Sequence, residues 1–128
     1  MKIHASIAIA VFFLSSAIFA APVRIGAVYA TSGVQAALDE PSWRGAQAAA
    51  AAAKAAAGGI ELVRVPYDST PASAAAAVRA SLAKDPSIAA FIGVSDSDVA
   101  LAAGREVVRS GKVFITSGAT SPLLPRQL

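Results

Sequence analysis

The chain has 128 residues, with 11 basic and 8 acidic residues, a net charge of +3, no cysteine and one histidine, His4. Aromatic residues do not alternate with lysine or arginine, so the composition gives no support for nucleic-acid binding. His4 stands in an N-terminal segment that we expect to be removed, and the rest of the chain lacks the commonest transition-metal ligands and any Ser-His-Asp or Cys-His centre. We therefore expect no enzymatic activity, no metal and no cofactor.

The N-terminal segment has the pattern of a secretory signal peptide. Lys2 precedes the apolar run Ile7–Leu14, and small residues lead to Ala20, after which we predict cleavage. An uncleaved membrane anchor is the alternative, but the run is shorter than the ~20 residues that a spanning helix needs. We expect residues 1–20 to be a signal peptide and residues 21–128 to be one small exported domain, periplasmic in a Gram-negative source.

The first two elements predicted after the signal are a strand and a helix. Val23–Ala30 is almost continuously apolar and predicts a strand. Trp43–Ala57 is rich in alanine, the residue with the highest helix propensity, and predicts a helix. Pro41 fits the first turn of this helix, with Asp39 or Glu40 near its cap.

A second strand and helix follow. Gly58-Gly59 is a typical helix end, and Ile60–Tyr67 predicts a strand in which Pro66 marks the end or an edge position. Thr70 is a suitable N-cap for a helix that starts with a proline and runs over residues 71–83.

The alternation continues as far as Thr116. Ile88–Val94 predicts a third strand, Ser95–Asp98 cap a helix that ends at Gly111, and Lys112–Thr116 predicts a fourth strand. Apolar strands without strict alternation are covered on both faces. The pattern therefore predicts an α/β fold, a doubly wound, mostly parallel sheet with helices on both faces and strand order 2-1-3-4.

Polar loops follow the strands on both sides of the switch point of this order, where open α/β sheets bind ligands. No dinucleotide or nucleoside-triphosphate motif is present, and Gly93–Ser97 matches a nucleophile elbow only in part. Hydroxyls and helix N-termini suit a carboxylate, and carbonyls with an Asp suit an ammonium, as in an amino acid. Helix capping alone would also place such residues here, but three polar loops at one edge favour a site. The residues concerned are Ser32, Ser95, Asp96, Ser97, Ser117, Gly118 and Thr120.

Between Val23 and Leu124, five short segments follow one another in an order and at spacings that are informative when they are taken together. They are VRIGAVYATSG, Gly45-Ala46 ahead of AAGGIELV, Tyr67-Asp68 ahead of Pro71, FIGVSDS and SGATSPLL. In this order the sequence resembles the N-terminal lobe of type I periplasmic solute-binding proteins, of the branched-chain amino acid class that serves ABC importers.

The resemblance implies how a ligand would be held. The hydroxyls of Ser97 and Thr120 would bind its carboxylate, and the backbone carbonyls of Ser95 and Gly118 its ammonium. It further implies a small amino-acid-like ligand and the membrane permease of an ABC importer as partner. Members of the family close two lobes around the ligand, so residues 21–128 are expected to be a truncated first lobe.

Other functions remain open from the sequence. The same lobe could serve as an exported ligand-sensing or partner-binding module, or the chain could be a truncated remnant without function. An exported hydrolase that uses Ser95 is a third alternative, which the lack of histidine and cysteine disfavours.

Overall fold

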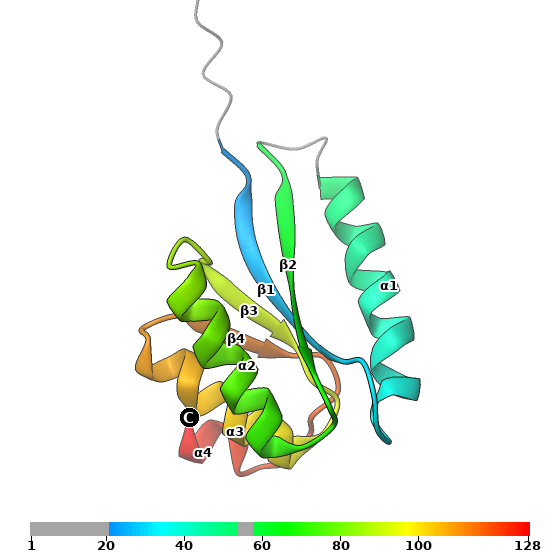
Figure 1. Ribbon diagram of the computed structural model, residues 1–128, viewed down its shortest axis with the longest axis vertical. Helices are drawn as coiled ribbons and strands as arrows, with labels where there is room; N and C mark the ends of the chain where they lie inside the picture. The colour runs from blue at the N-terminus through cyan, green and yellow to red at the C-terminus, as the bar shows by residue number, and fades with distance from the viewer. Residues whose placement is uncertain (1–20, 54–57) are drawn as a thin grey trace, which may run out of the picture.

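A computed structural model describes residues 21–53 and 58–128 (Figure 1). The predicted signal peptide, residues 1–20, and the predicted end of the first helix, at Ala57, lie outside these ranges. Among the described helices, none has the length and apolar character to cross a membrane. In chain order the elements are β1 (Val23–Ala30), α1 (Ala36–Ala53), β2 (Ile60–Tyr67), α2 (Pro71–Lys84), β3 (Ala90–Gly93), α3 (Ser97–Arg109), β4 (Val113–Thr116) and α4 (Leu124–Gln127).

The strands form one parallel sheet in the order β2-β1-β3-β4, which confirms the predicted topology. β1 pairs with β2 along its whole length, from Val23 opposite Ile60 to Ala30 opposite Tyr67. β2 is an edge strand, as Pro66 indicated, because a proline cannot donate to a second neighbour. Since all strands run in the same direction, the loops that follow them meet at one edge of the sheet.

Helix α1 begins earlier than the sequence suggested. The prediction placed its first turn around Pro41, whereas the structure starts it at Ala36 and puts Pro41 inside the helix. The missing N–H of Pro41 would have bonded the carbonyl of Ala37, an exposed residue that water can reach, so the loss is tolerated. Asp39 is therefore not a cap, and its side chain is completely buried.

The sequence predicted the start of α2 correctly, but it did not predict the bounds of β3. α2 starts where predicted, and the Thr70 hydroxyl accepts a hydrogen bond from the backbone N–H of Ser73 (3.2 Å). The predicted strand Ile88–Val94 is shortened at both ends to β3. It ends at Gly93 because Val94 takes a left-handed conformation (φ 65°) that turns the chain out of the sheet.

The main core lies between the sheet and the layer formed by α2 and α3, while α1 covers the opposite face (Figure 1). Phe91 of β3 is the largest fully buried side chain in this core. It belongs to one buried cluster with Val28 of β1, Val78 of α2 and Val107 of α3.

The sheet face on which α1 lies is less completely covered than the opposite face. The rings of Tyr29 and Trp43 lie 6.1 Å apart, and the guanidinium of Arg64 stands 4.4 Å from the Trp43 ring. Farther along the sheet, Val113 and Ile115 of β4 alternate with core residues and remain 60% and 59% exposed. Helix α1 therefore covers the β1–β2 half of this face and leaves the β4 half open.

Candidate functional site

The loops after β3 and β4 lie against each other at the carboxyl edge of the sheet. The N–H of Ser117 donates to the carbonyl of Gly93 (2.9 Å), and that of Gly118 to the carbonyl of Val94 (3.3 Å). A Cβ added to Gly118 would lie 3.3 Å from Cα and Cβ of Ser95. Two of the predicted site residues, Ser95 and Gly118, are therefore in direct contact.

A second link joins the same two loops. The Ser97 hydroxyl, at the first residue of α3, accepts a hydrogen bond from the N–H of Ser121 (3.2 Å). Thr120 precedes Ser121 and is exposed, whereas Ser97 is half-buried. The structure thus gathers the predicted residues Ser95, Ser97 and Gly118 and places Thr120 in the same loop. We call these four residues the carboxyl-edge site.

Asp96 caps helix α3. Helix capping was one of the two roles that the sequence allowed for this residue, and ligand binding was the other. Its Oδ1 accepts hydrogen bonds from the N–H groups of Asp98 (2.9 Å) and Val99 (3.0 Å). Its Oδ2 accepts from the side-chain amide of Gln35 (3.3 Å), which ties the loop after β1 to the same position. The carboxylate is thereby oriented to the positive end of α3.

Asp39 lies beside the carboxyl-edge site, although the sequence pattern indicated only a helix cap. Its Oδ2 accepts hydrogen bonds from the N–H of Ala30 (2.7 Å) and the hydroxyl of Tyr67 (2.8 Å), and its Oδ1 accepts from the Ser95 hydroxyl (2.7 Å). The donors belong to the ends of β1 and β2 and to the loop after β3. An acidic residue shortly before Pro41 is typical of a helix cap, so no local signal distinguished this role.

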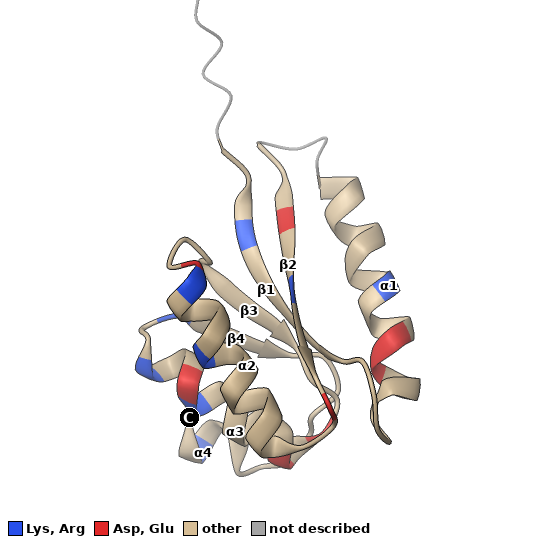
Figure 2. Cartoon of the chain, in the orientation of Figure 1, with Lys and Arg blue, Asp and Glu red and all other residues tan. Residues whose placement is uncertain are grey.

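The carboxyl edge is acidic. Figure 2 shows acidic bands at the start of α1, after β2 and at the start of α3. Segments 30–40, 67–70, 93–98 and 116–123 contain no lysine or arginine. Within the described residues, no group of three His, Cys, Asp or Glu side chains is arranged to hold a metal ion. The edge therefore offers hydroxyls, carbonyls and negative charge to a ligand.

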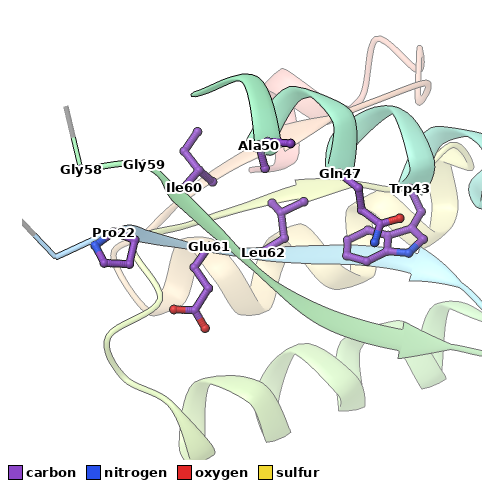
Figure 3. A pocket seen from close by; sticks show the side chains of 10 residues that line it. Pro22, Trp43, Gln47, Ala50, Gly58, Gly59, Ile60, Glu61 and Leu62 are labelled. Carbon is purple, nitrogen blue, oxygen red and sulfur yellow. The ribbon is translucent and has the colours of Figure 1, made fainter. Parts of the chain in front are cut away.

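A cavity of about 650 Å³ lies elsewhere, between α1 and the amino-terminal half of β2 (Figure 3). Ile60 and Leu62 point towards α1, and Trp43 and Gln47 form the facing wall. The alanines of α1 leave this space because their side chains are short. The cavity is at the end of β2 opposite the carboxyl-edge site, so the two features are separate.

Both tyrosines of the chain lie near Asp39. Burial raises the pKa of Tyr67 far above its usual range, and the hydrogen bond to Asp39 and the charge of that carboxylate act in the same direction. Burial also raises the pKa of Tyr29, together with the charge of Asp39, although the hydroxyl of Ser117 and the charge of Arg64 act in the opposite direction. Both phenols are therefore held neutral by the fold.

Alkaline titration is expected to produce no tyrosinate absorbance until the domain unfolds. A phenol with a raised pKa in the folded state adds stability below its unfolded pKa of about 10, and this contribution is lost as the pH rises towards the folded value. Ultraviolet absorbance and circular dichroism should therefore change together, in the native chain and in Tyr67→Phe, where only Tyr29 reports. Tyrosinate that forms near pH 10 with an unchanged circular-dichroism spectrum would contradict the expectation.

Comparison with known proteins identifies the family of the fold. A family model described as "Periplasmic binding protein" matches residues 22–126. A search among curated proteins found no significant match.

Several solved structures share the fold. The substrate-binding protein LivJ of a branched-chain amino acid transporter from Streptococcus pneumoniae, in complex with isoleucine, is 27% identical with a TM-score of 0.76, over 82% of this chain and 31% of that one. An ABC transporter substrate-binding protein from Sphaerobacter thermophilus is 26% identical with a TM-score of 0.67, over 80% and 28%. The leucine-binding protein LivK from Thermotoga maritima, 24% identical with a TM-score of 0.68 over 80% and 29%, is similar in fold. The chain thus spans about a third of the length of these proteins.

Proposed function

The chain belongs to the periplasmic binding protein family, and on this basis we propose that it is the substrate-binding component, or its N-terminal lobe, of an ABC importer for amino acids. Branched-chain amino acids or related small polar solutes are the proposed ligands. The observation that carries the proposal is the contact between the loops after β3 and β4, which puts Ser95, Ser97 and Gly118 at one edge. The LivJ structure with isoleucine supports the choice of ligand class.

In the proposed complex, the hydroxyls of Ser97 and Thr120 donate to the ligand carboxylate. Ser97 stands at the first residue of α3, where the helix dipole favours a negative charge. The carbonyls of Ser95 and Gly118 accept from the ammonium. The Ser95 hydroxyl already donates to Asp39, which is consistent with a role for its carbonyl rather than its side chain.

We also propose that residues 1–20 are removed on export, that residues 21–128 act in the periplasm as part of a first lobe, and that a membrane permease is the partner. The pattern of the N-terminal segment and the family support this view. Binding without catalysis is proposed because the relatives compared above are substrate-binding proteins.

Titration of residues 21–128 with L-isoleucine is expected to shift the amide signals of the carboxyl-edge site in a ¹⁵N-correlation spectrum. Ser97→Ala should weaken binding about ten-fold, because it removes a hydroxyl donor to a charged group. Ser110→Ala is a matched control, since its hydroxyl donates to Val107 at the other end of α3 and should leave the affinity unchanged.

The alternatives give different results in the same experiments. The absence of shifts across a panel of all common amino acids would contradict the proposed ligand class. A stable complex with another exported protein would instead favour a partner-binding module. An unfolded circular-dichroism spectrum of residues 21–128 would favour a remnant without function.

A further inference from the structure

The buried carboxylate of Asp39 connects the carboxyl-edge site to the sheet. It accepts from Ala30 and Tyr67, the last residues of β1 and β2, on one oxygen, and from Ser95 on the other. Because Asp39, Ala30 and Tyr67 are buried, removing the carboxylate leaves two buried donors, the Ala30 N–H and the Tyr67 hydroxyl, without acceptors, and it also releases the half-buried Ser95 hydroxyl.

The position of Ser95 controls the neighbouring loop as well. Its Cα and Cβ lie 3.3 Å from the place where Gly118 would carry a Cβ, so the two backbones are in close contact. These are the residues whose carbonyls the proposed complex directs at the ligand ammonium. A displacement of Ser95 therefore moves one proposed ligand group directly and removes the support of the other.

The charge of Asp39 can act on a ligand through its field, although the side chain itself is buried. Among the described residues, the ion pairs are formed by Glu40, Glu61, Asp85 and Glu106, and none includes Asp39. Arg64, whose charge acts on Tyr29 together with that of Asp39, pairs with Glu40, and Asp96 is a second negative charge that acts on Tyr67 together with Asp39. A buried charge is weakly screened, so its field favours an ammonium near Ser95.

We propose that Asp39 is a positioning residue of the amino-acid site, which holds Ser95 against Gly118 and gives the site its preference for a ligand that carries an ammonium group. The proposal rests on the function proposed above. It predicts that Asp39 acts on the ammonium end of the ligand, which a purely structural role would not do.

Two substitutions of Asp39 distinguish its effect on the position of Ser95 from the effect of its charge on the ligand. In Asp39→Asn, the amide oxygen can accept from Ala30 and Tyr67 while its NH₂ donates to the Ser95 oxygen, so the geometry is kept and the charge is lost. Asp39→Ala loses both. Tyr67→Phe is the matched control, because it removes a donor to the other oxygen of Asp39 and leaves the bond from Ser95 in place.

The ligand arm compares L-leucine with 4-methylpentanoate, the same carboxylate without the ammonium. The native chain should bind leucine more tightly, and Asp39→Asn should reduce this preference about ten-fold, since the field of one buried negative charge is lost. Tyr67→Phe should keep the preference. An unchanged preference in Asp39→Asn, with leucine binding intact, would overturn the role in ligand selection.

The ligand-free arm measures hydrogen exchange of the Ser117 and Gly118 amides against that of Ala103, a buried residue of α3. Asp39→Ala should accelerate exchange at Ser117 and Gly118 beyond the change at Ala103, and Tyr67→Phe should not. Equal acceleration at all three amides would overturn the positioning of the loops. If the native chain binds neither ligand, the proposed function fails, and this arm still decides whether Asp39 positions Ser95 and Gly118.

Discussion

Gly93→Ala is expected to lower the free energy of unfolding by about 3 kcal/mol or more, because it combines a steric clash with a strained backbone. Gly93 has a φ of 119°, a conformation that residues with a side chain rarely adopt. A Cβ at this position would overlap the carbonyl oxygen of Val28 on the neighbouring strand. The substitution should therefore force β1 and β3 apart where the loop to Ser95 begins.

Gly45→Ala is the matched control for this experiment. Gly45 lies inside α1, and a Cβ there would meet no atom within 4 Å. The same chemical change should raise the free energy of unfolding by about 1 kcal/mol, because alanine is the better helix former. Urea unfolding followed by circular dichroism measures both variants. A loss below about 1 kcal/mol for Gly93→Ala would show that the two strands are not packed as described.

Phe91→Ala is expected to lower the free energy of unfolding by about 3–5 kcal/mol, since it empties a fully buried aromatic site. Ile115→Ala on β4 removes a large apolar side chain that is 59% exposed, and should cost less than about 1 kcal/mol. Chemical denaturation of both variants tests the contrast. Similar losses would mean that the β4 half of the sheet is covered in solution.

The close approach of Gly26 to the Phe91 ring allows a direct test of the packing between β1 and β3. A Cβ at Gly26 would overlap the Phe91 ring, so Gly26→Ala should be strongly destabilising in the native background. In the Phe91→Ala background the ring is absent, and the added methyl should cost at least about 1 kcal/mol less. A double-mutant cycle by urea unfolding gives this coupling, and additive losses would contradict the proposed packing.

Much of the fold could be predicted because its signals are local. Alternating apolar and helical segments gave the parallel sheet and its strand order, and Thr70 marked the start of α2. The start of α1 was wrong because a proline is usually a first-turn residue, whereas the exposed carbonyl of Ala37 allows Pro41 inside the helix. The end of β3 was wrong because an apolar run does not reveal that Val94 takes a left-handed conformation.

Part of the candidate site could also be predicted, because the topology of a parallel sheet determines which loops meet. Loops that follow neighbouring parallel strands must meet, so Ser95 and Gly118 could be expected at one edge before their contact was seen. Asp39 could not be placed, because its hydrogen bond to Ser95 joins residues 56 positions apart. A carboxylate early in a helix has the same sequence pattern whether it faces water or the core.

The sequence by itself determined the order of the elements, the direction of the strands and the edge at which the polar loops collect. These follow from periodicity and capping, which act between residues close in the chain. Only the tertiary structure decided that Asp39 is buried against Ser95 and that Gly93 lies against Val28. Such contacts depend on how closely separate strands and helices pack, and that distance is set by all the side chains between them.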